Sequence, residues 1–162
     1  MTAAPSRLLL DSNVWIDLFA SDRPGRENAQ AIVGWAVERE VDLLYAASSI
    51  KDVYYLLEER EKRRLRAGGG EVTPASAAAI NEYAWGCIHA MEELATVVPV
   101  DQSDLWIATK YRSVHGDFED DLLLAAVERA KADFLVTSDE ALLRHAPVAA
   151  IAPCDLLKLV SA

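Results

Sequence analysis

Short apolar runs alternate with longer segments of helical periodicity along this chain. Leu8 to Leu10 form the first run, and three adjacent leucines are typical of a strand that is buried on both faces of a sheet. Such strands belong to parallel sheets that helices cover on both sides. The runs that predict further strands lie at 41–46, 96–100 and 134–136, and 148–151 is long enough for a fifth.

Between these runs, apolar residues recur at three- and four-residue spacing, as on one face of an amphipathic helix. The predicted helices span 12–19, 27–39, 74–94, 101–114, 118–131, 140–144 and 155–160, and another begins near Ser48 or Ser49. Strands that alternate with helices predict an α/β fold. We expect one three-layer domain over residues 1–162, with a central, mainly parallel sheet of four or five strands flanked by helices.

Cap and breaker residues set several of the expected boundaries. Ser48 and Ser49 are good N-cap residues for the helix that follows the second strand. Pro74, directly after Thr73, occupies the favoured first position of another helix. Pro99 cannot donate a backbone hydrogen bond, which indicates that the third strand lies at an edge of the sheet.

Charge and composition narrow the classes of function. The 162 residues carry 26 acidic and 16 basic side chains, a formal net charge of −10 at pH 7, which argues against a general polyanion-binding surface but not against local basic patches. The N-terminal residues lack the apolar core of a signal peptide, and we expect no membrane-spanning segment. Two isolated cysteines, Cys87 and Cys154, favour a reduced, cytoplasmic location.

Four aspartates lie where the predicted topology brings them to one edge of the sheet. Asp11 follows the first strand, and Asp139 lies three residues past the fourth. Asp52 and Asp120 fall in the first turns of helices that begin at this edge, outside the carboxyl ends of the strands, where ligands bind in open α/β sheets. Carboxylates are the ligands that Mg²⁺ and Mn²⁺ favour, and a divalent cation relieves the repulsion between crowded carboxylates.

Each of these acids also has an explanation in helix capping. Asp11 and Asp139 lie where they can cap the helices that follow them. Asp52 stands three residues after Ser49, close to a capping-box pattern, and Asp120 suits the positive end of a helix. From the residues alone, the interpretation is an acid-lined edge that is compatible with metal binding.

Spacing leaves two further choices among the acids. Asp101 and Asp104, after the third strand, meet the same edge criterion and stay open as alternatives. The residues three, four and seven positions after Asp120 are all apolar, whereas those after Asp121 include Glu128. This periodicity predicts that Asp120 faces the sheet and that Asp121 turns towards solvent.

The segments that carry the acids resemble the motifs of a known family. Segments 9–17 and 117–126 resemble the first and third acidic motifs of the PIN-domain nucleases. Segment 132–139 resembles the closing strand and fourth motif of that family. The order and spacing of these motifs fit the family across nearly the whole chain. In length and single-domain layout, the chain resembles the VapC-like toxins of type II toxin–antitoxin systems.

This resemblance implies a Mg²⁺- or Mn²⁺-dependent endoribonuclease that hydrolyses RNA without a covalent enzyme intermediate. It assigns metal-site roles to Asp11, Asp120 and Asp139, and Asp117 is a candidate outer ligand. Asp52 stands in the place where the family usually carries glutamate. The resemblance also implies a cognate antitoxin protein as partner and, as in many members of the family, a homodimer. On the same basis, Asn13 or Ser138 could orient a ligand or a phosphate.

The densest basic segment is open to two interpretations. It consists of Arg60, Lys62, Arg63, Arg64 and Arg66. These residues could hold RNA phosphates near an otherwise repulsive acidic site. Cations at a helix C-terminus also favour the macrodipole while they stay solvated, and the sequence slightly favours this second interpretation.

Two rival classes of function remain at this point. One is a degenerate PIN domain that binds RNA or a protein partner without cleavage, which the shorter acid at Asp52 keeps open. The other is an acid-cluster phosphatase of α/β fold. We rank the phosphatase low, because Asn13 stands where a second aspartate of an Asp-x-Asp nucleophile pair would be needed.

Overall fold

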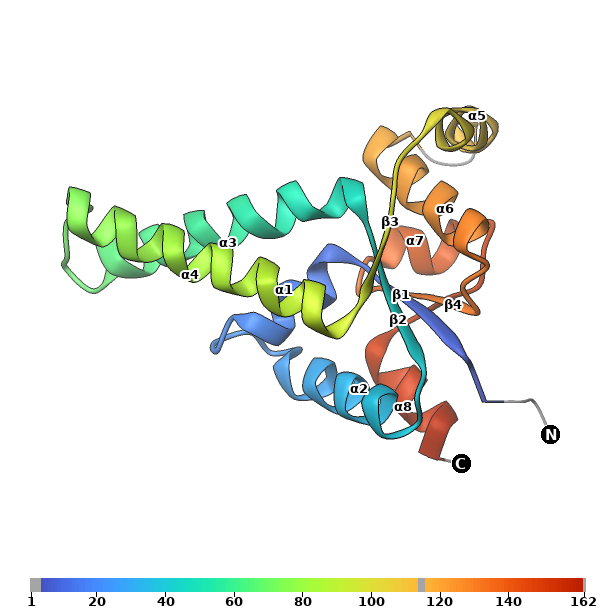
Figure 1. Cartoon of the computed structure of the whole chain (residues 1–162), viewed down its shortest axis with the longest axis horizontal. Coiled ribbons are helices and arrows are strands. Elements are labelled where there is room, and N and C mark those ends of the chain that lie inside the picture. The colour runs from blue at the N-terminus through green and yellow to red at the C-terminus, as the bar shows by residue number, and fades with distance from the viewer. Residues whose placement is uncertain (1–3, 114–115, 162) are drawn as a thin grey trace.

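The computed structural model describes residues 4–113 and 116–161 of the chain (Figure 1). The strands are β1 (Arg7–Leu10), β2 (Asp42–Ala46), β3 (Thr96–Val98), β4 (Phe134–Val136) and β5 (Ala150–Ile151). The helices are α1 (Ser12–Phe19), α2 (Arg26–Glu38), α3 (Ala47–Ala67), α4 (Pro74–Leu94), α5 (Gln102–Tyr111), α6 (Phe118–Ala130), α7 (Glu140–His145) and α8 (Pro153–Ser161).

The five strands form one sheet in the order β3-β2-β1-β4-β5, and every pairing is parallel. The predicted α/β class with a parallel sheet is therefore confirmed. β3 lies at one edge, as Pro99 indicates, and it ends at Val98, directly before this proline and its neighbour Val100. Because Pro99 has no backbone N–H, the strand stops two residues short of its expected end.

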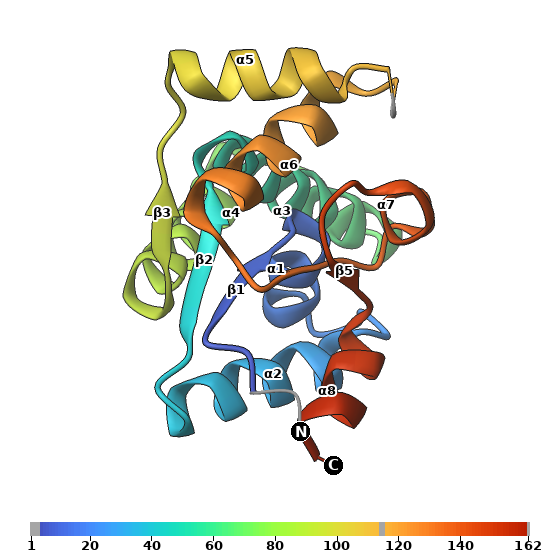
Figure 2. The same cartoon turned by 90° about the vertical axis from the view of Figure 1, so that its right-hand side faces the viewer.

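Helices cover both faces of the sheet, which gives the expected three layers (Figure 2). α1, α2, α8 and parts of α3 and α4 pack on one face, and α5, α6 and α7 pack on the other. Leu8 and Leu10 belong to the first core, whereas Leu9 belongs to the second. All three side chains are fully buried, so β1 is the doubly covered strand that its leucines predict.

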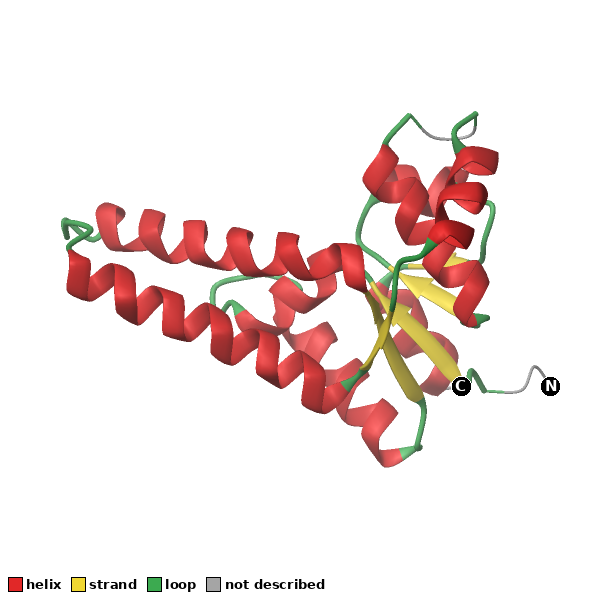
Figure 3. Ribbon diagram, turned by 45° about the horizontal axis from the view of Figure 1, so that its top comes forward, coloured by secondary structure: helices red, strands yellow, loops and turns green. Residues whose placement is uncertain are grey.

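The long helices α3 and α4 form an antiparallel pair that extends beyond the sheet (Figures 1 and 3). Gly69, in the turn between them, has a φ of 81°, a conformation that favours glycine. Thr73 caps α4, and its hydroxyl oxygen accepts a hydrogen bond from the backbone N–H of Ser76 at 3.2 Å. Pro74 is the first residue of α4, so this predicted helix start is confirmed.

The predicted start of α3 is wrong. Ser48 and Ser49 do not cap the helix, because α3 begins at Ala47 and its N-cap is Ala46, the last residue of β2. The chain passes from strand to helix without a loop, which leaves no place for a serine cap. The expected end of α5 at Val114 lies outside the described residues.

An ion pair with a buried carboxylate joins α1 to the loop before α2, and the sequence pattern did not predict it. Asp17 is only 4% exposed, and its Oδ1 lies 2.6 Å from Nε of Arg23. Gly25 packs so closely on this pair that a Cβ atom there would overlap Oδ2 of Asp17. A buried carboxylate needs such a partner, so the pair fixes the course of the loop.

Neither cysteine forms a disulfide: Cys87 is buried and Cys154 is exposed. Among the residues that the structure describes, no helix is long and apolar enough to cross a membrane.

Two glycines offer a matched test of the packing around Asp17. We expect Gly25→Ala to lower the free energy of unfolding by about 1–3 kcal/mol, because the new methyl group overpacks the ion pair. Gly34→Ala, in the middle of α2, meets no atom within 4 Å and should raise the free energy of unfolding by about 0.5–1 kcal/mol. Denaturant unfolding measures both, and a neutral Gly25→Ala would contradict the described packing.

Candidate active site

The sheet changes direction between β1 and β4. From β1 the chain continues to β2 and β3 on one side, and it then crosses to β4 and β5 on the other side. The crevice outside the carboxyl ends of the strands at such a switch point is where open α/β sheets bind ligands. Leu10 and Val136 are partners in the parallel register, so Asp11 and Thr137 leave the sheet side by side.

The carboxylate of Asp11 is buried and accepts four hydrogen bonds. Oδ1 accepts from the backbone N–H of Ser12 at 2.6 Å and from its hydroxyl at 3.2 Å. Oδ2 accepts from Nδ2 of Asn13 at 2.9 Å and from the hydroxyl of Thr137 at 2.7 Å. Four donors match the lone-pair capacity of a carboxylate, so a cation that bound Asp11 directly would replace one of them.

Thr137 is the centre of this network, and the sequence analysis missed it. Its side chain is fully buried; the hydroxyl donates to Asp11 and accepts from Nδ2 of Asn13 at 3.1 Å and from the backbone N–H of Asp139 at 3.0 Å. One donor and two acceptor sites are thus all used. The sequence signal was a hydroxyl residue directly after the fourth strand, at the position that faces Asp11 across the register.

Asp139 lies close enough to Asp11 for their charges to repel each other. Its Oδ1 caps α7 by accepting hydrogen bonds from two backbone N–H groups, at 2.7 and 3.0 Å. Burial raises the pKa of Asp11 above its usual value, hydrogen bonds from Thr137 and Ser12 oppose this rise, and the charge of Asp139 adds to it. A divalent cation between two such carboxylates would relieve their repulsion.

Asp52 faces a different set of charges. It lies in the second turn of α3, not in a capping box, since the helix begins at Ala47. Nζ of Lys51 lies 3.6 Å from Oδ1 of Asp52 and 3.3 Å from Oε1 of Glu119 on α6. Burial raises the pKa of Asp52, the charge of Glu119 raises it further, and Lys51 lowers it. Asp52 therefore belongs to the contact between the second turn of α3 and the first turn of α6.

The acids at the start of α6 differ from the expected arrangement. Asp117 is the N-cap and accepts from the backbone N–H groups of Glu119 at 2.8 Å and Asp120 at 3.3 Å. The predicted rotation of the helix is wrong: Asp121 is 3% exposed, whereas Asp120 is only partly buried. α6 packs against both the sheet and α5, so its buried face is broader than the single stripe that periodicity predicts.

Asp101 and Asp104 have structural partners instead. They form the capping box of α5, and the backbone N–H of Asp101 donates to Oδ2 of Asp104 at 2.6 Å. The guanidinium of Arg129 pairs with both carboxylates. These contacts account for the two acids after β3.

The structure does not bring four carboxylates into one ready-made cluster. Within residues 4–113 and 116–161, no three histidine, cysteine, aspartate or glutamate side chains lie close enough to each other to hold a metal ion. Asp139 acts on Asp11 through its charge, across the ends of β1 and β4. This pair still fits a hard cation, because Mg²⁺ is usually bound by one or two carboxylates with water and substrate phosphates completing its shell.

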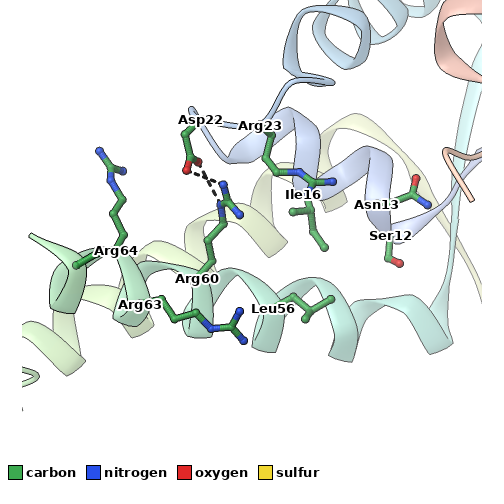
Figure 4. A pocket seen from close by; sticks show the side chains of 10 residues that line it. Ser12, Asn13, Ile16, Asp22, Arg23, Leu56, Arg60, Arg63 and Arg64 are labelled. Atoms are coloured by element: carbon green, nitrogen blue, oxygen red, sulfur yellow. Dashed lines mark hydrogen bonds and ion pairs between the residues drawn. The ribbon is translucent and has the colours of Figure 1, made fainter.

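Three arginines of the basic segment lie beside this edge. Arg60, Arg63 and Arg64 line a pocket of about 560 Å³ that Ser12 and Asn13 also line (Figure 4). Lys62 instead pairs with Glu58 at 3.1 Å. The pocket gives the basic residues a setting that the sequence does not reveal, next to two neighbours of Asp11.

A family model for the PIN domain matches residues 7–141. The chain therefore belongs to the PIN-domain family, as its motifs predict. Its fold is similar to that of VapBC2 from Rickettsia felis, solved bound to a DNA fragment from the promoter: the TM-score is 0.65 at 8% identity, over 90% of this chain and 98% of that chain.

Two other solved structures show the same likeness. VapC20 of Mycobacterium tuberculosis, a toxin that cleaves the sarcin–ricin loop, gives a TM-score of 0.56 at 13% identity, over 79% of this chain and 86% of that chain. A toxin–antitoxin complex from Klebsiella pneumoniae gives a TM-score of 0.55 at 15% identity, over 90% of this chain and 97% of that chain. At these identities the likeness shows the fold alone. A comparison with curated protein sequences finds no match.

A change of Thr137 tests the hydrogen-bond network around Asp11. Thr137→Val removes the hydroxyl, and we expect the free energy of unfolding to fall by about 1–3 kcal/mol. The pKa of Asp11 should rise further, because the lost hydrogen bond lowers it in the wild type. Thr137→Ser keeps the hydroxyl and should track the wild type.

The pH dependence has a defined sign. A folded-state pKa above the unfolded value means that the folded protein holds the proton of Asp11 more tightly, so the free energy of unfolding falls as the pH rises between the two pKa values. Thr137→Val should extend this window upwards. Denaturant unfolding across pH, together with carboxyl titration by NMR, measures both effects. Identical results for the Val and Ser variants would contradict the role of the hydroxyl.

Proposed function

We propose that this protein is a divalent-metal-dependent endoribonuclease that acts as the toxin of a toxin–antitoxin pair. The observation that carries the proposal is the buried carboxylate of Asp11, which Thr137 holds beside Asp139 at the switch point of the sheet. Membership of the PIN-domain family supports nuclease chemistry at this edge.

In this proposal Asp11 and Asp139 hold Mg²⁺ or Mn²⁺. A bound cation would supply an activated water as nucleophile and would stabilise charge on the phosphate. Asn13 and Thr137 orient Asp11, and the backbone N–H of Ser138 donates to Oδ1 of Asn13 at 3.2 Å, which holds that amide in place.

The proposal also assigns roles to the acids of α6 and α3. Asp121 replaces Asp120 as the favoured ligand from α6, because its side chain is the buried one. Asp117 is an outer residue that fixes the first turn of α6 by capping it. Asp52 lies beside Lys51 and Glu119, and it would hold the cation only after leaving that contact.

A second candidate function is a PIN domain that binds RNA or a protein without cleavage. The observation that favours it is the lack of a three-acid cluster within the described residues. A metal-binding titration separates the two functions, because a domain that only binds RNA or protein does not require a cation at Asp11.

The partners in the proposal are RNA and a cognate antitoxin protein. Two of the similar structures are complexes of a toxin with its antitoxin, which supports a protein partner here. A homodimer also belongs to the proposal, since α5 and the start of α6 expose Leu105, Trp106 and Phe118. Two free cysteines agree with a cytoplasmic location, which we propose as well.

Cleavage assays test the proposed reaction. Purified protein with Mg²⁺ or Mn²⁺ should cut RNA, EDTA should stop the reaction, and Asp11→Asn should reduce cleavage to background. Asp101→Asn is the matched control, because Asp101 is an aspartate after a strand that caps its helix without contacting Asp11. Cleavage without metal, or products with 2′,3′-cyclic phosphate ends, would contradict hydrolysis by an activated water.

A second experiment decides between the adjacent acids of α6. Mg²⁺ or Mn²⁺ should raise the melting temperature of the wild type by mass action. We expect Asp121→Asn to lose most of this rise and Asp120→Asn to keep it, since Asp121 is the buried carboxylate. The reverse result would restore Asp120 as the ligand. Equal rises in the wild type and both variants would show that neither acid binds the metal.

A further inference from the structure

An arginine-lined pocket lies between α1, the loop after it, and α3 (Figure 4). We call it the arginine pocket; its charged lining is Arg23, Arg60, Arg63, Arg64 and Asp22, and Ser12 and Asn13 line it too. Its volume is about 560 Å³. Four guanidinium groups against one lining carboxylate stand out in a protein whose net charge is −10. A local concentration of positive charge of this kind attracts anions in spite of the overall charge.

Arg23 is held in place by an ion pair on the side away from the pocket opening. Its Nε lies 2.6 Å from Oδ1 of Asp17, which is buried, while about a third of the Arg23 side chain stays exposed at the pocket. An ion pair with a buried carboxylate is hard to exchange, because loss of Arg23 would leave the buried charge of Asp17 without this compensating cation. Arg23 is thus a fixed donor whose outer edge faces the pocket.

The arginines of α3 have partners that are easy to exchange. Arg63 pairs with Glu59 at 3.1 Å and Arg64 with Glu61 at 3.7 Å, and both arginine side chains are exposed. Ion pairs of this exposed kind contribute little to stability, so an incoming anion can displace them with small loss. Arg60, Arg63 and Arg64 follow a three- and four-residue spacing and therefore share one face of α3.

Asp22 occupies Arg60 across the pocket. Oδ2 of Asp22 lies 2.6 Å from Nη2 of Arg60, and Oδ1 accepts from Nε at 3.1 Å, so the carboxylate engages the guanidinium with both oxygens. A phosphate presents two oxygens to a guanidinium in the same forked geometry. Asp22 is exposed and comes from the loop that Asp17 and Arg23 fix.

We propose that the arginine pocket binds the phosphates of the single-stranded RNA next to the cleavage site, and that Asp22 occupies Arg60 until a phosphate replaces it. In this proposal the RNA strand runs from Asp11, past Ser12 and Asn13, along the face of α3 that carries the three arginines. This inference rests on the proposed ribonuclease function, and it assigns that function a substrate-binding subsite. The basic segment then has a role beyond that of a solvated helix end.

The test measures binding without cleavage. A fluorescently labelled 12-nucleotide oligouridine is titrated with the full chain in EDTA over a range of salt concentrations. The triple variant Arg60→Ala, Arg63→Ala, Arg64→Ala should bind more weakly. The negative slope of log affinity against log salt should become less steep by about 2, or roughly 0.7 for each lost phosphate contact. Melting temperatures establish that the variant is folded.

Asp22→Asn should have the opposite effect. Removal of the competing carboxylate frees Arg60, and the affinity for oligouridine should rise about two- to fivefold, the range that corresponds to one exposed ion pair. The matched control is Asp155→Asn, which breaks the exposed pair between Asp155 and Lys158 at 2.8 Å on α8, away from the pocket. This control should leave the affinity unchanged.

Three outcomes would overturn the proposal: an unchanged salt slope in the triple variant, an equal gain from Asp22→Asn and Asp155→Asn, or tighter binding of a 12-residue oligoglutamate than of oligouridine. The last would identify an acidic protein segment as the occupant. Because binding is measured in EDTA, the result is independent of catalysis. RNA binding that depends on the arginine pocket, without any cleavage, would contradict the nuclease function but support the subsite. Metal-dependent cleavage that is unchanged in the triple arginine variant would support the nuclease function but contradict the subsite.

Discussion

The hydrogen bond from Thr137 to Asp11 is the contact on which the candidate site depends. It joins the first residue after β1 to the first residue after β4, across the point where the sheet changes direction. The same hydroxyl accepts from Asn13 and from the backbone of Asp139, so one fully used oxygen fixes three neighbours of the proposed cation. The parallel register of Leu10 with Val136 makes this possible. A shift of one residue would separate Asp11 from Thr137.

Much of the fold could be predicted from the sequence, because local patterns and simple chain topology determine it. Leu8 to Leu10 predicted a doubly covered strand, and β1 is buried on both faces. Pro99 predicted an edge, and β3 is the last strand of the sheet on its side. Thr73 and Pro74 predicted the start of α4 because capping depends on neighbouring residues alone.

The details that failed depend on contacts between distant segments. Asp121 is buried although its own helical period predicts an exposed position. α6 packs against α5 as well as against the sheet, and the period of one helix holds no information about such neighbours. Ser48 and Ser49 lost their cap role because β2 runs directly into α3. Thr137 carries no motif of its own; its importance follows from the register of β4 against β1.

The same distinction applies to charge. Net charge argued against a general polyanion-binding surface, yet it averaged over a pocket that gathers four arginines from α3 and the loop after α1. The pairing of Asp17 with Arg23, six residues apart, combines burial with a turn, and neither is visible in the sequence pattern. Acidic and basic regions therefore lie next to each other at one edge: the acid pair would suit a cation, and the basic pocket would suit an anion.

The central claim is that a divalent cation binds between Asp11 and Asp139. Paramagnetic broadening by Mn²⁺ in backbone NMR spectra locates such an ion directly. At substoichiometric Mn²⁺, the signals of Ser12 and Thr137 should disappear first, together with that of Asp139, while the signal of Asp101 stays sharp. Broadening that centres on Asp101, or that spreads evenly over the acidic surface, would contradict the account.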